Sequence, residues 1–541
     1  MPVFESRIDT RSEQFSKNRE GMLKAIAEFR AVEDKVRATE ESKRERFHQR
    51  KQLLPRERVS LMLDRGSPFL ELSTCCGYMM HDDKDGSLAG GNTIIGIGYV
   101  EGVRAMVSAS NSAIKGGTMT PWGVQKGLRV QEIALQQKLP VVSMIESGGA
   151  NLLYQAEVFI PGGRTFANQA RLSAAGIPQI TVVHGSSTAG GAYMPGLSDY
   201  VVMVRKQAKV FLAGPPLLKA ATGEVATDED LGGAEMHCEV AGTSEFLAEN
   251  DADAIRIARE VMRSLNWNAQ RPAIATLPVA EPLYDIGELC GVVPVDYRKP
   301  YDSREVIARL VDGSEFLDFK YEYDRQTICG RAVIQGHSVG IIANNGPITV
   351  RGATKAGQFI QLCCQTNLPI IYLMNTTGYM VGSESEQGGI VKHGSKMIQA
   401  VANATVPQIT IILGGSFGAG NYGMCGRGFG PHFIFAWPNS RTSVMGGEQA
   451  AGVMEIITRE KWQKQGKQMT DTDEKMLASI RQGIVGQFDK ESNALAATAR
   501  LFDDGLIDPR DTRRVLGYTL SICREAQARP LNPNSYGIAR M

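Results

Sequence analysis

Two glycine-rich turns carry the residue types that can stabilise a developing negative charge. One spans residues 185–193 and the other spans residues 414–422. Each follows a short β-branched run that reads as a buried strand, and each is expected to open a helix. Small side chains let a ligand approach the main chain, and free N–H groups at a helix start can then face an oxyanion. These turns suit an enolate oxygen, and one such donor lowers a barrier by roughly 2.7–4 kcal/mol.

Each feature of the turns also has a plainer interpretation. The glycines would serve equally well for tight packing of a helix on a strand, although finding the turn twice favours a ligand-binding role. The tyrosines that close the turns, Tyr193 and Tyr422, are either ligand-facing or merely packed. Glu146 and the pair Lys392-His393 are interpreted as solvated or internally satisfied groups.

Two familiar motifs in the second turn lack the downstream residues that would complete them. Gly418-x-Gly420-x-x-Gly423 fits a dinucleotide fingerprint, but no acidic residue stands about 20 residues later. Gly414-x-Ser416-x-Gly418 fits a nucleophile elbow, which needs an acid and then a histidine further along the chain. The last histidine is His432, and no acid lies between it and Ser416. The dinucleotide fingerprint is therefore interpreted as a decoy, and a hydrolase triad of that order is excluded.

The chain contains an internal duplication. Ile177-Pro178-Gln179-Ile180 parallels Val406-Pro407-Gln408-Ile409, and Leu139-Pro140 parallels Leu368-Pro369. Both pairs have the same spacing along the chain, since 407 − 178 equals 368 − 139, and this spacing is called the repeat offset below. Further matching blocks occur upstream in the same order, so a repeated supersecondary unit is indicated. Alternating strand and helix signals predict an α/β fold with largely parallel strands.

The boundaries follow from the repeat and from composition. We expect a helical arm at residues 1–50, a first domain at 51–285 and a second at 286–541, with a proline-rich boundary near 267–297. The arm carries Met22, Ile26 and Phe29 at helical spacing, and residues 518–541 read as a closing helix and tail.

Composition narrows the class of protein. The 541 residues include 59 basic and 58 acidic ones, giving a net charge of +1, so no nucleic-acid or membrane-surface partner is indicated. Nine cysteines without a C-x-x-C pair favour a reduced, cytoplasmic chain. No apolar run reaches membrane length, and the seven histidines show no metal-ligand spacing. We therefore expect no metal.

Taken together, the motifs resemble the carboxyltransferase (β) subunits of biotin-dependent acyl-CoA carboxylases, in the branch of geranyl-CoA and methylcrotonoyl-CoA carboxylases. The resemblance covers nearly the whole chain. It rests on residues 51–58, 63–71, 188–193, 211–216, 221–224, 388–394, 414–424 and 444–450. It implies tandem crotonase-like (ClpP-like) β-β-α superhelix domains, acyl-CoA on the first domain and carboxybiotin on the second domain of a neighbouring subunit.

The resemblance also implies roles for individual residues. Gly190 and Gly191 would hold the thioester oxygen of the enolate, and Ala419 and Gly420 the ureido oxygen of biotin. The substrate-binding candidates are Ala189, Ala192, Tyr193, Gly162, Gly163, Phe417 and Tyr422. No side-chain base would be needed, since the biotin ring can take the substrate proton after releasing its carboxyl group.

One departure from the methylcrotonoyl pattern bears on the substrate. Between Phe159 and Phe166 the chain reads Ile-Pro-Gly-Gly-Arg-Thr, where methylcrotonoyl enzymes carry a longer, aromatic segment. Gly162 and Gly163 would open a longer acyl pocket, which favours geranyl-CoA over methylcrotonoyl-CoA.

The sequence also leads to an expected partner subunit and leaves several alternative functions open. The chain lacks ATP-grasp and biotin-attachment motifs, so a biotin carboxylase and biotin carrier α subunit is expected, in an α6β6 complex around a β hexamer. The alternatives are a methylcrotonoyl-CoA carboxylase β subunit, a biotin-dependent decarboxylase subunit, a crotonase-type hydratase or isomerase, and a non-catalytic scaffold.

Overall fold

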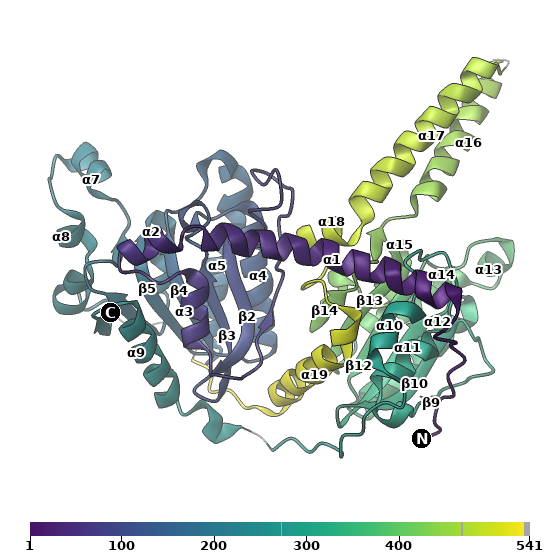
Figure 1. Cartoon of the computed structure of the whole chain (residues 1–541), viewed down its shortest axis with the longest axis horizontal. Coiled ribbons are helices and arrows are strands. Elements are labelled where there is room, and N and C mark those ends of the chain that lie inside the picture. Colours follow the sequence, from purple (N-terminus) through teal and green to yellow (C-terminus); the bar gives the residue numbers. More distant parts are fainter. Residues whose placement is uncertain (272, 467–468, 535–541) are drawn as a thin grey trace. The chain divides into compact units, whose positions relative to one another are not determined.

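The computed structural model describes all residues except 272, 467–468 and 535–541, and it places the described chain in two compact units (Figure 1). The first-half unit contains residues 30–274, 499–501 and the C-terminal segment from Ile522. The second-half unit contains residues 1–29, 275–498 and 502–521. Helix α1 (Glu13–Glu41) contributes residues to both units, and its Met22, Ile26 and Phe29 are buried. Each unit has its own sheet.

The first-half unit is an eight-stranded sheet covered by helices. The strands are β1 (Leu70–Glu71), β2 (Thr93–Val100), β3 (Val103–Ser110), β4 (Val141–Ser147), β5 (Gln179–Thr188), β6 (Tyr200–Val204), β7 (Lys209–Phe211) and β8 (Phe246–Ala248). The helices include α2 (Arg44–Gln49), α3 (Pro55–Met62), α4 (Pro121–Gln136), α5 (Gln155–Ala174), α6 (Tyr193–Gly196), α7 (Pro215–Thr222), α8 (Asp228–Gly232) and α9 (Asp251–Ser264). The strand order is β1-β2-β3-β4-β5-β6-β8, with β7 beside β5. Helices α3 and α9 pack against the sheet, and α4 packs against α5.

The second-half unit repeats this plan. Its strands are β9 (Leu317–Asp318), β10 (Thr327–Ile334), β11 (His337–Asn344), β12 (Ile370–Thr376), β13 (Gln408–Phe417), β14 (Phe433–Ala436) and β15 (Arg441–Ser443). Its helices include α10 (Leu289–Val292), α11 (Ser303–Leu310), α12 (Val350–Gln365), α13 (Ser383–Gln387), α14 (Ile390–Ala402), α15 (Gly418–Gly423), α16 (Gly447–Lys464) and α17 (Asp471–Ser492). Two further helices, α18 (Ala494–Ala499) and α19 (Thr512–Ala528), lie near the unit boundaries. The strand order is β14-β13-β12-β11-β10-β9, with β15 beside β13.

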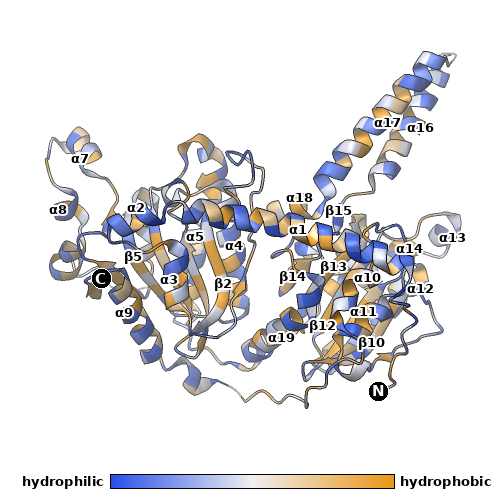
Figure 2. Ribbon diagram, in the orientation of Figure 1, coloured by the Kyte–Doolittle hydropathy of each residue, from blue (hydrophilic) through white to orange (hydrophobic). Residues whose placement is uncertain are grey.

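Strand register confirms that the halves are copies. Ser143 of β4 pairs with Thr181 of β5, and Tyr372 of β12 pairs with Thr410 of β13. The repeat offset separates Ser143 from Tyr372 and also separates Thr181 from Thr410, so the two pairs are equivalent. Both parallel pairs then shift register just before Ser147 and Thr376. In both halves a β-hairpin precedes three parallel strands, and hydrophobic residues run through the strands of both sheets (Figure 2). Continuous β-branched runs buried on both faces are typical of parallel strands.

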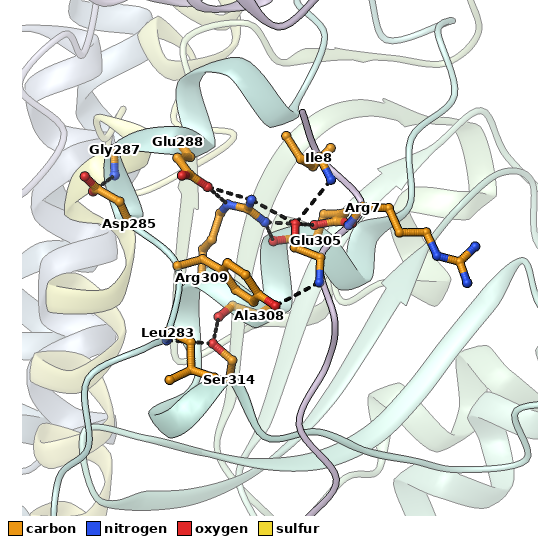
Figure 3. A network of polar contacts seen from close by, with 12 residues as sticks. Arg7, Ile8, Leu283, Asp285, Gly287, Glu288, Glu305, Ala308, Arg309 and Ser314 are labelled. Carbon is orange, nitrogen blue, oxygen red and sulfur yellow. Dashed lines mark hydrogen bonds and ion pairs between the residues drawn. The ribbon is translucent and has the colours of Figure 1, made fainter. Parts of the chain in front are cut away.

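The N-terminal segment is held to the second-half unit by a buried arginine. Arg309 of α11 is 1% exposed and donates to Glu288 Oε2 at 2.6 Å and to Glu305 Oε2 at 2.9 Å (Figure 3). Glu305 in turn accepts from the hydroxyl of Ser6 at 2.6 Å and from the backbone N–H of Arg7 at 2.8 Å. The buried guanidinium of Arg309 fixes the segment firmly through Glu305. Loss of either carboxylate would leave a buried charge without its partner.

The C-terminal end of α19 is held to the first-half unit in a similar way. Glu525 lies 3.2 Å from the Arg104 guanidinium, and Arg529 stacks over the ring of Trp267 at 4.8 Å. The Arg529 carbonyl accepts from Lys138 Nζ at 2.6 Å. The first half of the sequence therefore forms its unit together with residues from the far end of the chain.

A buried carboxyl group follows α18. Asp503 is 1% exposed, and its Oδ1 accepts from Thr498 Oγ1 at 2.6 Å and from the Gly505 N–H at 2.9 Å. Its Oδ2 has no hydrogen-bond partner in the described part of the chain. Burial raises the pKa of Asp503 to about 7, with the neighbouring Asp504 acting in the same direction.

Replacing Asp503 by Asn is expected to stabilise the protein increasingly as the pH rises. Since the folded pKa lies above the unfolded one, the stability that the neutral carboxyl contributes is complete below about pH 4. It is lost as the pH rises toward and through 7. The melting temperature of Asp503→Asn minus that of the wild type should therefore increase between pH 5 and pH 8. The exposed Asp489→Asn serves as the control, and an unchanged difference for Asp503→Asn would contradict the assignment.

Candidate functional site

Both predicted turns begin with the same unusual backbone conformation. Ala189 follows β5 with φ +52°, and Gly418 follows β13 with φ +51°, and the two positions are related by the repeat offset. A short 3-10 helix over Ala189–Ala192 runs into α6 in the first turn, and α15 (Gly418–Gly423) follows the kink in the second. A left-handed alanine costs about 1–2 kcal/mol. Strain of this kind at a strand-to-helix turn persists where the surrounding structure fixes it.

The turns present backbone N–H groups that the fold does not use. The first N–H groups of a helix have no acceptor within it. In the described part of the chain, no residue outside these turns accepts from the amides of Gly190, Ala419 or Gly420. Gly190 and Ala419 are exposed, whereas Gly191 and Gly420 are buried. Each turn thus offers main-chain donors at its surface, supported by a buried glycine.

A second small loop lies beside each turn. After β4, the Gly149 N–H donates to Ser147 Oγ at 3.1 Å, and after β12 the Gly378 N–H donates to Thr376 Oγ1 at 3.2 Å. Gly149 has φ +90° and Gly378 has φ +127°, which favour glycine. A side-chain carbon on Gly420 would lie 2.9 Å from the Gly378 Cα atom. The glycines therefore allow backbone to approach backbone at the site.

The remaining candidates in the turns divide between surface and interior. Tyr193 is 48% exposed and Tyr422 is 47% exposed, so both rings stand at the surface in matching positions. Each packs on one aromatic neighbour, Phe166 for Tyr193 and Phe429 for Tyr422. Phe417 is buried against Tyr297 at 4.8 Å between ring centroids, and Ala192 is also buried.

Helix α5 brings the two glycines of the acyl-chain prediction near the first turn. Gly162 and Gly163 follow Pro161 inside this helix, where Gly162 is buried and Gly163 is exposed. Phe166, one turn further along, would lie 3.9 Å from a side-chain carbon on Gly190. A side-chain carbon on Gly162 would meet only Val158, at 4.0 Å. The structure therefore places α5 against the first turn and leaves space at Gly162.

A buried charged cluster supports the strand that carries the first turn. Arg58, 1% exposed, donates from Nη1 to Glu146 Oε2 at 2.9 Å and from Nε to Asp251 Oδ2 at 3.1 Å. The Ser112 hydroxyl donates to the same Glu146 oxygen at 2.8 Å. A side-chain carbon on Gly185 of β5 would lie 2.7 Å from Glu146. The glycine at this position therefore lets the Glu146 side chain pass close to the strand.

Burial favours the neutral form of the histidine in this cluster. Burial lowers the pKa of His184, and the Arg58 charge adds to that effect, although Asp251 opposes it. Its Nδ1–H therefore donates to Asp251 Oδ1, at 2.8 Å. Burial alone would raise the pKa of Asp251, but the hydrogen bonds from His184 and the Leu53 N–H, together with the charge of Arg58, outweigh it and hold that pKa low. The cluster is thus a fixed charge arrangement.

Comparison with known proteins identifies the family. The model for the carboxyl transferase domain matches residues 46–535. The chain belongs to the carboxyl transferase family. A probable biotin-dependent acyl-coenzyme A carboxylase beta2 subunit of Mycobacterium tuberculosis is 50% identical over 498 residues, covering 92% of each chain. A probable mitochondrial methylcrotonoyl-CoA carboxylase beta chain of Drosophila melanogaster is 45% identical, covering 96% of this chain and 92% of the relative.

Among solved structures, the chain is similar to the beta subunit of geranyl-CoA carboxylase from P. aeruginosa. The sequences are 60% identical, each chain is covered completely, and the TM-score is 0.93. The predicted α/β fold of tandem crotonase-like domains is thereby confirmed, as is membership among the carboxyltransferase subunits of biotin-dependent carboxylases. This carboxyl transferase is therefore an enzyme subunit that works with a biotin-bearing partner.

The described residues offer neither a metal cluster nor a membrane span. No group of three or more His, Cys, Asp or Glu side chains among them is placed to hold a metal ion. Nor does any helix in this part of the chain combine the length and the apolar character needed to cross a membrane.

Sequence reasoning missed the charged support of the first turn. Arg58, His184 and Asp251 had been given no role, and no local motif could have joined Arg58 to Asp251 across 193 residues. The loops at Gly149 and Gly378 were also missed, although Ser147-x-Gly149 and Thr376-x-Gly378 are related by the same repeat offset as the turns. Extending the repeat to this pair would have found them.

Strain at Ala189 predicts a stability change of unusual sign. Ala189→Gly should raise the melting temperature slightly, because relief of about 1–2 kcal/mol exceeds the roughly 0.5–1 kcal/mol entropic cost of glycine. Ala192→Gly is the matched control in the same turn: its φ is −64°, so it should lower the melting temperature. Thermal unfolding of both variants and the wild type tests this, and equal destabilisation would refute strain at Ala189.

Proposed function

We propose that this chain moves a carboxyl group from carboxybiotin, carried by its partner, to the γ-carbon of a β-methyl enoyl-CoA, with geranyl-CoA as the preferred substrate. The observation that carries the proposal is the pair of left-handed turns at Ala189 and Gly418, each of which leaves main-chain donors unused. The separate halves would serve separate ligands: residues 51–285 the acyl-CoA and residues 286–541 the carboxybiotin.

The first turn would stabilise the substrate anion. Gly190 and Gly191 would donate to the thioester oxygen as the γ-proton leaves and charge spreads through the dienolate. Glu146, the carboxylate nearest in sequence to the neighbouring loop at Gly149, already accepts from Arg58 and Ser112. Its role is to hold the strand, and the first turn supplies position and electrostatics.

The second turn fits a neutral ring oxygen that gains charge. Ala419 and Gly420 open α15, where unpaired N–H groups favour an anion. The strand behind the turn carries a neutral residue where the first half has Glu146, since Asn375 Oδ1 accepts from the Gly415 N–H at 2.8 Å. When bound, carboxybiotin would supply the carboxyl group, and the biotin ring left behind would accept the substrate proton. The residues of this chain would orient the ureido oxygen and keep water away.

The substrate preference rests on helix α5. Gly162 is buried, and a side-chain carbon there would meet only Val158 at 4.0 Å, so space is left in the helix that packs on the turn that would hold the thioester. A longer branched chain needs such space, whereas a bulky side chain there would limit the enzyme to short esters. Methylcrotonoyl-CoA is therefore the second substrate.

Assembly with further subunits is part of the proposal, as a β hexamer with six α subunits. Leu152, Leu153, Phe159 and Ile160 beside the first turn are each at least 74% exposed. In the second-half unit, the α16–α17 hairpin exposes Val453, Met454, Ile456, Ile457, Met476 and Ile480 (Figure 2). Apolar surface of this kind marks a protein interface.

The second turn provides the test of catalysis. In Gly420→Val the new side chain would meet Thr376 Cγ2 at 2.8 Å and displace the turn. Carboxylation by the complex with the biotin-bearing partner should fall at least about 100-fold, the loss expected for an oxyanion donor. Affinity for the CoA ester should stay within about threefold.

The matched control is Gly428→Val, where a side-chain carbon meets nothing within 4 Å. Retained activity in Gly420→Val would point to a scaffold. Activity of the wild type only as a decarboxylase, without dependence on ATP and bicarbonate, would replace the proposal by that reaction.

The acyl preference is tested by filling the space in α5. Gly162→Phe should lower kcat/KM for geranyl-CoA by at least about tenfold relative to methylcrotonoyl-CoA, since a hydrophobic pocket discriminates by steric room. Gly162→Ala, whose side chain fits without a collision, should change the ratio little. A wild-type enzyme that strongly prefers methylcrotonoyl-CoA would contradict the proposed substrate.

A further inference from the structure

The first-half unit contains a partly open cavity of about 170 Å³ between its sheet and helices α4 and α5. One water needs roughly 10–15 Å³ and a drug-sized ligand roughly 300 Å³ or more, so this space suits part of a ligand. Residues lining it include Ser143, Ser147, Thr165, Gln179 and Met194. Three of these lie close in sequence to the candidate site: Ser147 precedes Gly149, Thr165 follows Gly163 and Met194 follows Tyr193.

In the second-half unit, side chains fill the region that corresponds to this cavity. At its inner end, Tyr372 is the counterpart of Ser143 by the repeat offset and holds the same register position in its sheet. Its side chain is completely buried, and its hydroxyl donates to Gln408 Oε1 at 2.8 Å, where Gln408 is the counterpart of Gln179. A tyrosine therefore occupies the region that Ser143 leaves open in the first half.

A second tyrosine closes the outer end. Tyr379 is the counterpart of Ala150, since Met119 bridges to Ala150 as Ile348 bridges to Tyr379. Its side chain lies between Gly394 and Gly423, within 3.0 Å of the side-chain positions that these glycines lack. Their counterparts in the first half are Thr165 and Met194, which both line the cavity. Ala150 itself is exposed and does not line the cavity, but a tyrosine placed there as Tyr379 is in the second half would lie between Thr165 and Met194, which do.

The cavity lining suits an apolar chain. Thr181 and Ser198 share a hydrogen bond of 2.6 Å, and Ser108 donates to Ser143 at 3.2 Å, so these hydroxyls are paired with one another. The remaining wall includes Ile95, Val124, Val130, Ile145 and Leu172. Thr93 Oγ1 and Gln131 Oε1 have no hydrogen-bond partner in the described chain.

We propose that this cavity receives the distal end of the acyl chain, and that Ser143 and Ala150 set the length accepted because the second half carries tyrosine at both positions. This inference rests on the proposed function. It explains which of two similar halves takes the acyl group: the other is filled by its own side chains. Gly162 would govern entry to the space, whereas Ser143 would govern its depth.

The test copies the second half into the first. Ser143→Tyr, in the complex with the biotin-bearing partner, should lower kcat/KM for geranyl-CoA at least about tenfold relative to methylcrotonoyl-CoA, since even one methylene can be worth tenfold in a fitted pocket. Ser143→Leu should lower the same kcat/KM ratio by a smaller factor. Ala150→Tyr should also lower this ratio, by filling the opposite end of the space. These two variants keep the test usable if Ser143→Tyr does not assemble. Tyr372→Phe leaves an aromatic ring in the corresponding region of the second-half unit, so it should leave the kcat/KM ratio of the two esters unchanged.

Other outcomes overturn the inference in distinguishable ways. Equal losses for both esters in folded, assembled Ser143→Leu and Ala150→Tyr would show that the cavity has no part in acyl selection. Weaker binding of free CoA to the same variants, as large as the loss for the ester, would place the pantetheine arm there instead. A wild-type complex that carboxylates neither ester would refute the proposed function rather than the cavity assignment.

Discussion

Everything at the candidate site depends on a chain reversal that turns backbone N–H groups outward at the end of a central strand. The left-handed residue, Ala189 or Gly418, makes the reversal, and the helix after it leaves its first amides unpaired. A backbone N–H cannot be reoriented by rotating a side chain. Its direction is therefore fixed by the position of the strand that precedes it. That requirement explains the glycines at 149, 378 and 420, which let neighbouring backbone segments touch.

The duplicated fold has been adapted differently in its two halves. Near the first turn, Glu146 and Arg58 form part of a buried charged cluster, whereas Asn375 holds the equivalent strand with a neutral hydrogen bond. His184 is replaced by Leu413 at the same repeat position. A buried charge network is costly unless fully paired, and it resists deformation when it is. One half has retained a rigid charged support and an internal space, and the other has closed its interior with tyrosine.

The sequence predicted those features that arise from local chemistry or from the repeat. Strands β5 and β13 were expected from β-branched runs, and the turns from their small residues, because these signals lie within a few neighbours of one another. Helix α5 was harder to foresee, since it continues through Pro161-Gly162-Gly163, which have low helix propensity. There, packing against the first turn overrides local preference. The charged cluster was out of reach for another reason: its members come from α3, β4, β5 and α9, and only the folded sheet brings them together.

The exchange of chain ends between the units bears on how the protein is made. The first-half unit includes residues up to Ile274, yet it also contains Glu525 and Arg529, which pair with Arg104 and Lys138. During translation at about 5–20 residues per second, those late residues appear roughly 12–50 s after Ile274 (522 − 274 residues). Nascent chains must therefore carry an incomplete first unit throughout that interval. The face of Trp267 that Arg529 covers in the folded chain stays open until then.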